Sequence, residues 1–270
     1  MGGLFTGLFY AVLLIVTDGC ALRPLTAEEH PWGNFQPNSW GIVRTVTTSN
    51  IDGRAVQSQQ AVRTTLLSVD EDGITLQKSE TLNLGGRQIE KQPRIVKYDF
   101  FQEPIQENVQ ISERPPVKLV IDRRVVPCAV RTYEQQTSSG HLTTTIWYTP
   151  HVYPHVLRVE RILRAVPEGD SVVKGSGGGQ IIRQSVTLVQ ETSALRGLRG
   201  NRRNRTYTLQ TVERVGNITR ITDTRCSWDV PGGLLESTTR ELDAQNREIR
   251  RSVSLMTNYF SCELPSLYPQ

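Results

Sequence analysis

From Trp40 onward, short segments rich in Val, Ile, Leu and Thr alternate with turn residues along the chain. None of these segments sustains the 3.6-residue apolar period of an amphipathic helix, so the pattern predicts strands. The clearest hairpin is the segment 66–76, in which Leu-Leu-Ser-Val turns through Asp-Glu-Asp-Gly into Ile-Thr-Leu. Because most connections are only a few residues long, antiparallel pairing is favoured. The expected fold is mainly β, with little helix.

The first twenty residues differ from the rest, because Leu4 to Val16 is an apolar run broken only by Thr6 and Gly7. At about 1.5 Å of rise per residue, a run this short cannot cross a hydrocarbon core about 30 Å thick. It has instead the length of the apolar region of a signal peptide. We therefore expect residues 1–20 to direct export, with a buried core helix as the alternative.

The end of this segment resembles a bacterial lipobox, in which a small residue precedes a cysteine that receives lipid after cleavage. Gly19 and Cys20 occupy these two positions, while Thr17 and Asp18 stand where the pattern prefers Leu and a small or apolar residue. The resemblance implies lipidation at Cys20. Simple cleavage near Ala21 and a retained, weakly anchored N-terminus are the alternatives.

Two further segments divide the chain by their composition. Residues 21–39 hold three prolines without an apolar period, and this pattern predicts a tether that leads to the first strand. The Gly/Ser stretch 175–179 predicts a flexible hinge. The expected organisation is therefore a β-rich half at 40–174 and a second one at 180–270.

The two halves share an order of residues: a strand, a glycine turn, a Thr-rich strand, a Trp, and a Pro-containing turn into an outgoing strand. In the first half Trp147 leads to Pro154, and in the second half Trp228 leads to Pro231. An internal duplication explains this order with one event. Two antiparallel hairpins that converge on similar turn residues explain it equally well.

The segment that begins at Trp228 and continues through Pro-Gly-Gly to Leu-Leu-Glu-Ser, within 225–240, resembles a hairpin of known proteins. It is similar to the closing hairpin in β-rich members of the bacterial lipoprotein-carrier superfamily, with a weaker echo at 147–160. In those proteins a strongly curved antiparallel sheet wraps an apolar groove. The resemblance implies a curved antiparallel sheet of half-barrel or sandwich form, built as one sheet or as two related halves.

The chain has four cysteines, and lipid on Cys20 would leave Cys128, Cys226 and Cys262. In an oxidising compartment we expect one disulfide and one buried thiol, with Cys226 and Cys262 as the candidate pair. Three buried thiols are the alternative. The spacings match no zinc pattern.

The net charge of +4 is modest for 270 residues, and the basic residues are mostly Arg interleaved with Glu and Asp. This balance argues against a protein that grips phosphate backbones, and we expect no nucleic-acid partner. The densest basic run is a candidate contact for an anionic partner such as lipopolysaccharide or an anionic lipid surface, and a solvated hairpin loop is the alternative. This run comprises Arg196, Arg199, Arg202, Arg203 and Arg205.

No convergent set of catalytic groups is visible in the sequence. Neither a Gly-x-Ser-x-Gly elbow nor a His-Glu-x-x-His helix occurs. His151 and His155 are four apart, but Pro150 and Pro154 interrupt the helix that would bring them together. We expect no catalytic, cofactor-binding or metal-binding residue, and an enzyme of unknown reaction is the second alternative.

The expected function is that of an exported, lipid-anchored protein of the bacterial cell envelope with a structural or assembly role. Its partners would be the membrane, through the N-terminal lipid, and other envelope proteins. The first alternative is the binding or carriage of an apolar ligand or lipid in a groove of the curved sheet. The two differ in whether the concave face is empty and apolar.

Overall fold

The structure is a computed structural model that describes residues 23–51, 54–165, 179–193 and 206–261. In these ranges it contains one short 3-10 helix, η1, and thirteen strands that pair antiparallel in a single sheet. No described segment is an α-helix, and the prediction of a mainly β fold is confirmed. The elements are η1 (Ala27–Glu29), β1 (Trp40–Ile51), β2 (Arg54–Val69), β3 (Ile74–Leu84), β4 (Arg87–Tyr98), β5 (Val109–Ile121), β6 (Arg124–Thr137), β7 (Gly140–Tyr148), β8 (Val156–Arg164), β9 (Ile181–Thr192), β10 (Thr206–Val215), β11 (Ile218–Ser227), β12 (Leu234–Leu242) and β13 (Glu248–Phe260).

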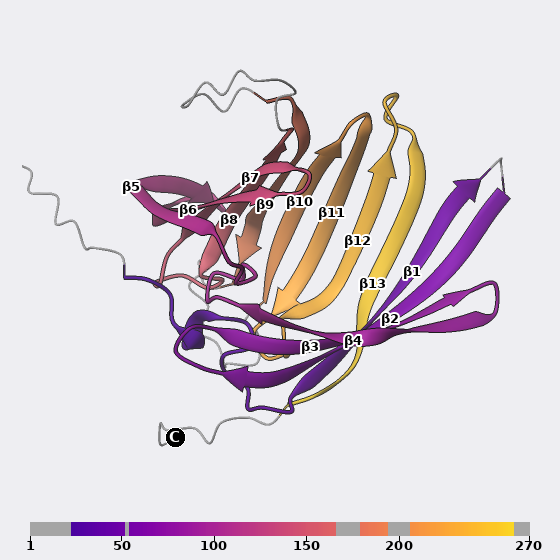
Figure 1. Ribbon diagram of the computed structural model, residues 1–270, viewed down its shortest axis with the longest axis horizontal. Coiled ribbons are helices and arrows are strands. Elements are labelled where there is room, and N and C mark those ends of the chain that lie inside the picture. The colour runs from indigo at the N-terminus through magenta and orange to yellow at the C-terminus, as the bar shows by residue number, and fades with distance from the viewer. Residues whose placement is uncertain (1–22, 52–53, 166–178, 194–205, 262–270) are drawn as a thin grey trace, which may run out of the picture.

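The strands follow the spatial order β4-β3-β2-β1-β13-β12-β11-β10-β9-β8-β7-β6-β5, so the first and last strands, β1 and β13, pair with each other. The sheet is open and strongly curved, with β1–β4 and β5–β8 forming two arms on either side of the central strands (Figure 1). The curved antiparallel sheet is therefore confirmed, and it is continuous. The predicted hinge falls almost entirely within residues 166–178, which lie outside the described residues.

The hairpin predicted at 66–76 is present, because Val69 pairs with Ile74 across the β2–β3 turn. The Asp70 carboxylate accepts hydrogen bonds from the backbone N–H groups of Asp72 and Gly73, both at 3.0 Å. A Cβ at Gly73 would lie 2.0 Å from the carbonyl oxygen of Tyr98. The hydrogen bonds of the Asp70 carboxylate and the close approach of β4 to Gly73 together fix the geometry of the β2–β3 turn.

Both edges of the sheet are interrupted by proline. The edge strand β4 contains Pro93, and the opposite edge strand β5 contains Pro115 and Pro116. At both places the strand register shifts, between Lys78 and Glu80 on β3 opposite Pro93 and between Arg114 and Val117 on β5. Proline has no N–H to offer, and a bulge twists the edge away from a straight partner. Both edges are therefore poor templates for pairing with another strand.

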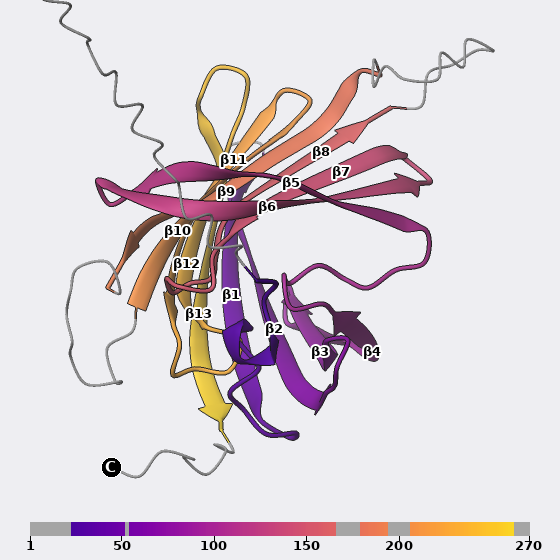
Figure 2. The same cartoon turned by 90° about the vertical axis from the view of Figure 1, so that its left-hand side faces the viewer.

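The segment expected to be a tether is part of the folded structure from Arg23 onward. Trp32 and Phe35 are buried in one cluster with Leu66, Ile74 and Leu76 of the β2–β3 arm. Gly232, at φ 78°, lies against the Trp32 ring, which a Cβ there would approach to 2.9 Å. Figure 2 shows this N-terminal segment inside the curve of the sheet. Residues 23–39 therefore form a plug that covers one end of the concave face, and they are not a flexible link.

The loop between β4 and β5, residues 99–108, fills the same end from the other arm. The Asp99 carboxylate accepts the backbone N–H groups of Phe101 at 3.0 Å and Glu103 at 2.9 Å, and the Tyr133 hydroxyl donates to it at 2.5 Å. The Phe101 ring packs edge-on against Tyr148 with a centroid separation of 4.8 Å. One end of the half-barrel is therefore closed by its own side chains.

The two turns that look alike in sequence contact each other at the closed end. Trp147 lies on β7, whereas Trp228 lies just after β11, so the two indoles differ in local structure. Tyr153, from the turn after β7, packs edge-on against Trp228 at 4.3 Å and against Tyr207 at 5.0 Å. Each of the two similar segments thus contributes a turn, and the aromatic side chains of the two turns pack in one cluster.

The plug is held by buried polar groups as well as by aromatic rings. Glu29 accepts hydrogen bonds from the N–H and the hydroxyl of Thr26 at 2.6 and 2.7 Å and pairs with Arg23. Nδ1 of His30 accepts the backbone N–H of Trp32 at 3.1 Å. Burial lowers the pKa of His30 to about 4, so the folded protein holds this imidazole neutral.

We predict that His30 makes the protein less stable as the pH falls. The unfolded chain protonates His30 near its ordinary pKa of about 6.5, whereas the folded state resists protonation down to about 4. The unfolded state therefore binds more protons in this window, and the free energy of unfolding should drop by up to about 3 kcal/mol across it. His30→Gln should flatten this dependence in urea unfolding followed at several pH values, and the exposed His151→Gln should not. Equal slopes in the parent and His30→Gln would contradict the assignment.

Candidate functional site

Most of the residues named from sequence lie outside the described residues. These are Cys20, Cys262 and the run Arg196, Arg199, Arg202, Arg203 and Arg205, so lipidation, the disulfide and the anionic contact stay predictions. Cys226 is described and lies buried on β11 beside Tyr207. Burial raises the pKa of the Cys226 thiol to about 11, and that of Cys128 likewise to about 11. Both thiols are therefore protonated at neutral pH, which leaves them unreactive.

The concave face of the central strands carries a row of hydroxyl side chains. The strand register places one of them on each of six adjacent strands, in the order β9, β10, β11, β12, β13 and β1. All six lie on the face of the sheet that the plug covers at one end. They form three hydrogen-bonded pairs, with oxygen separations of 2.8 Å for the first and 2.9 Å for the other two. In strand order the pairs are Thr187 with Thr211, Thr222 with Thr239, and Ser252 with Thr47.

A second hydroxyl row lies one step closer to the plug. Thr224, Ser237, Ser254 and Thr45 are partners on the consecutive strands β11, β12, β13 and β1. Thr45 and Ser254 are hydrogen-bonded at 2.8 Å. We call the part of the concave face that the plug leaves open the groove. Its floor is therefore polar across several of the central strands.

A charged row crosses the same face one step further from the plug. Glu213 on β10 pairs with Arg183 on β9 and with Arg220 on β11, the latter at 2.5 Å. Arg220 also donates to Glu241 on β12 at 2.7 Å, and Arg250 on β13 lies 3.9 Å from Glu241. Positive and negative groups therefore alternate across five strands.

This charged row is partly withdrawn from water. The Glu213 side chain is 7% exposed, whereas the Arg183 and Arg220 side chains are 58% and 40% exposed. Burial alone would lower the pKa of Arg220, but the hydrogen bonds and charges of Glu241 and Glu213 raise it above its ordinary value. The Glu213 carboxylate is thus buried, whereas the two arginines that pair with it stay partly exposed.

The polarity of the floor changes along each strand. On β10, alternate residues step from buried Tyr207 and partly buried Leu209 to Thr211 and then to Glu213. On this strand the apolar positions belong to the closed end, where core clusters already fill the space. In the part that the plug leaves open, the central strands are lined by hydroxyl and charged groups, whereas on one arm the row of Thr47 continues through Ser58 to the exposed Leu84 of β3.

A cavity of about 330 Å³ lies beside this groove, beneath the 99–108 loop. Glu103 from the loop forms an ion pair there with Arg161 of β8. Burial raises the pKa of Glu103, and Arg161 opposes part of this rise. The walls also include Tyr98, Tyr133, Leu142 and Thr144. The cavity is small and mixed in polarity, and sequence reasoning missed it because its two charged residues are 58 positions apart.

Neither a metal centre nor a helical membrane span is found in the ranges that the structure describes. No three His, Cys, Asp or Glu side chains gather there as a metal site would require. No helix among those residues is long and apolar enough to cross a membrane.

Among the solved structures that are similar to this chain are two bacterial proteins with provisional assignments. One is an outer membrane lipoprotein-sorting protein domain from Vibrio parahaemolyticus, with a TM-score of 0.35 and 9% identity over 83% of this chain and 85% of that one. The other is an exported protein with a YmcC-like fold from Bacteroides fragilis, with a TM-score of 0.29 and 8% identity over 84% and 99%. No protein-family model matches the chain, and no curated protein matches it. At these TM-scores the likenesses carry no argument about function.

We predict that the charged row stabilises the sheet where it is buried. Glu213→Ala would leave two guanidinium groups without their shared carboxylate and should lower the free energy of unfolding by about 1.5–3 kcal/mol. The control is Glu236→Ala, because Glu236 also pairs with an arginine but on the outer face, with both side chains more than half exposed. That change should cost about 0.5 kcal/mol or less. Equal losses in urea unfolding would show that the inner row is as solvated as the outer one.

Proposed function

We propose that this chain is an exported, lipid-anchored protein of the bacterial cell envelope with a structural or assembly role, which holds a hydrated polar partner in its concave groove. The observation that carries the proposal is the floor of the groove, where two hydroxyl rows and one charged row cross the central strands. A partner rich in hydroxyl, amide or charged groups can exchange hydrogen bonds with such a floor.

The alternative of carrying an apolar ligand has less support from the same floor. An acyl chain laid on it would displace water from hydroxyl and charged groups without replacing the lost hydrogen bonds. Such a replacement costs on the order of 1–3 kcal/mol for each neutral group that is left without a hydrogen bond, and more for each charged group whose partly exposed partner loses water. Trp32 is already buried in the plug, and exposed apolar side chains such as Leu84 and Ile89 lie on the β3–β4 arm, outside the polar rows of the central strands.

The filled closed end also fits an assembly role. Its core clusters join the plug, the 99–108 loop and both arms, so the sheet is shaped without a ligand. A rigid frame with a polar groove can present a fixed surface to a partner. Export and anchoring rest on the apolar segment that ends at Cys20, and the described chain begins three residues later at Arg23.

We predict that a photo-crosslinking residue in the groove captures a partner in living cells. Thr239 and Thr238 are neighbours on β12, and the register places Thr239 on the inner face opposite Thr222 and Thr238 on the outer face opposite Asp223. The residue at Thr239 should give an adduct with a glycan or protein segment that the residue at Thr238 does not give. Mass spectrometry of the adducts identifies the partner class. A lipid adduct at Thr239 would favour the carrier, and equal yields at both positions would rule out a groove partner.

A further inference from the structure

The β5–β6 hairpin projects beyond the strand next to it. Ala129 of β6 pairs with Tyr148, the last residue of β7, so the residues before Ala129 have no partner on β7. One side of the projecting tip is anchored, because Ile121, Val126 and Cys128 are buried in a cluster with residues of β8 and β9. The tip is therefore held in place while its other side is free of neighbours.

That other side presents an apolar pair to solvent. Val120 and Val125 are cross-strand partners next to the turn, and they are 68% and 62% exposed. Among large apolar side chains in the described ranges, only Ile95 is as exposed, at 64%, and it pairs with polar Gln77. Two adjacent exposed valines at the end of a hairpin form a small apolar wedge.

The wedge is surrounded by positive charge. Lys118, Arg123 and Arg124 are exposed around it, and Asp122 is the single acid between Lys118 and Val125. Asp122 and Arg123 form the turn with φ values of 46° and 62°, a conformation that glycine or asparagine adopts more readily than arginine. The turn thus carries an arginine at its tip despite the backbone cost.

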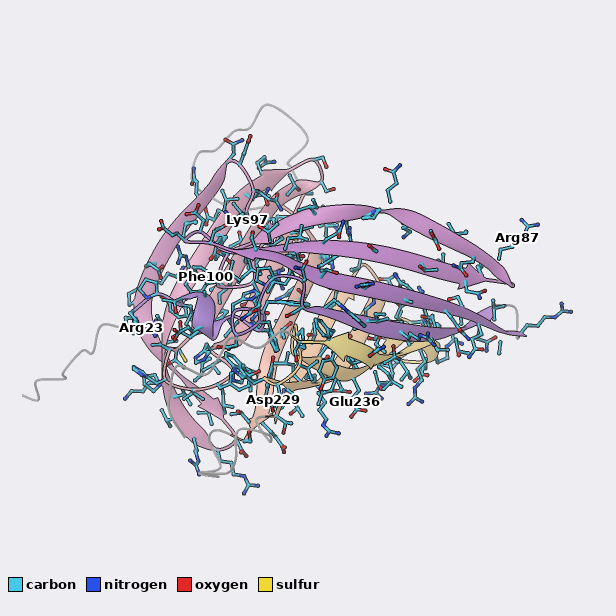
Figure 3. All side chains as sticks on the ribbon, turned by 90° about the horizontal axis from the view of Figure 1, so that it is seen from below. Arg23, Arg87, Lys97, Phe100, Asp229 and Glu236 are labelled. Atoms are coloured by element: carbon cyan, nitrogen blue, oxygen red, sulfur yellow. The ribbon has the colours of Figure 1, made fainter. Side chains whose placement is uncertain are left out.

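The N-terminal segment enters the fold beside this hairpin. Leu25 is buried in one cluster with Ala129 of β6. Figures 1 and 2 both place the start of the described chain on the side of the β5–β6 hairpin, and Figure 3 places Arg23 and Arg87 at opposite ends of the molecule. Arg23 is the third residue after Cys20, so their Cα atoms are about 11 Å apart at most. An anchor at Cys20 would therefore hold the membrane close to the hairpin.

We propose that the tip of the β5–β6 hairpin is a second membrane contact that inserts Val120 and Val125 into the interface of an anionic lipid bilayer. Apolar side chains enter the interface, and the surrounding cations are attracted to anionic headgroups. Two valines offer far less than the roughly 800 Å² that each partner contributes to a stable protein interface, which favours a membrane over a protein. The proposal uses the proposed N-terminal anchor for its orientation only.

The test compares Val125→Trp with Ile95→Trp in the mature full-length chain added to vesicles of phosphatidylcholine with phosphatidylglycerol. The two positions are equally exposed but lie on opposite arms. Brominated lipid should quench the added indole of Val125→Trp, beyond the quenching of the parent, and leave that of Ile95→Trp unchanged. Lys118→Gln with Arg124→Gln should lower binding to these vesicles at least about fivefold and leave binding to pure phosphatidylcholine unchanged.

The mass of the mature N-terminus is measured on the same samples, so that the anchor and the hairpin are judged separately. Quenching of Val125→Trp in a protein whose N-terminus carries no lipid would contradict the proposed anchor and support the hairpin contact. A lipid mass with no extra quenching of Val125→Trp over Ile95→Trp would overturn the hairpin contact and keep the anchor. Shielding of the new indole by self-association, seen as a doubled particle mass in light scattering, would also overturn it.

Discussion

The burial of Trp32 and its neighbours inside the curve of the sheet is the contact on which the architecture depends. A sheet of thirteen strands with two open edges has a broad inner face, and one end of that face is covered by residues 23–39 and 99–108. Trp32 lies against Gly232 from the centre of the sheet and against Leu66 and Leu76 from one arm. The segment that precedes the first strand therefore links parts of the sheet that are far apart along the chain.

The plug covers only one end of the concave face, and the side chains of the groove change where the plug ends. On the central strands, the inner positions near the plug are largely apolar, and beyond the plug these strands change to Thr, Ser, Glu and Arg. The hydroxyl groups pair with one another across strands, and the buried carboxylates of Glu213 and Glu241 are matched by arginines. The central floor of the groove is thus polar and partly exposed, which suits a polar partner better than an acyl chain.

The β character, the hairpin at 66–76 and the antiparallel pairing could be predicted from sequence, because each depends on neighbouring residues. The plug could not, since Trp32 and Phe35 stand among prolines at a spacing that matches neither helix nor strand. The hydroxyl rows could not either, because they require the register of six strands and include the contact of Thr47 with Ser252. The ion pair of Glu103 with Arg161 likewise joins a loop to a distant strand. Such contacts are set by the sheet as a whole.

The central claim is that the groove is a polar site rather than a lipid-carrying one. Native mass spectrometry of the mature protein, released gently from the envelope, tests it most directly. The account predicts a mass equal to that of the mature chain with its N-terminal lipid and no further fatty acid or phospholipid. A second, non-covalent lipid that is lost when Thr222 and Thr239 are changed to aspartate, and kept when Thr238 is, would contradict the account.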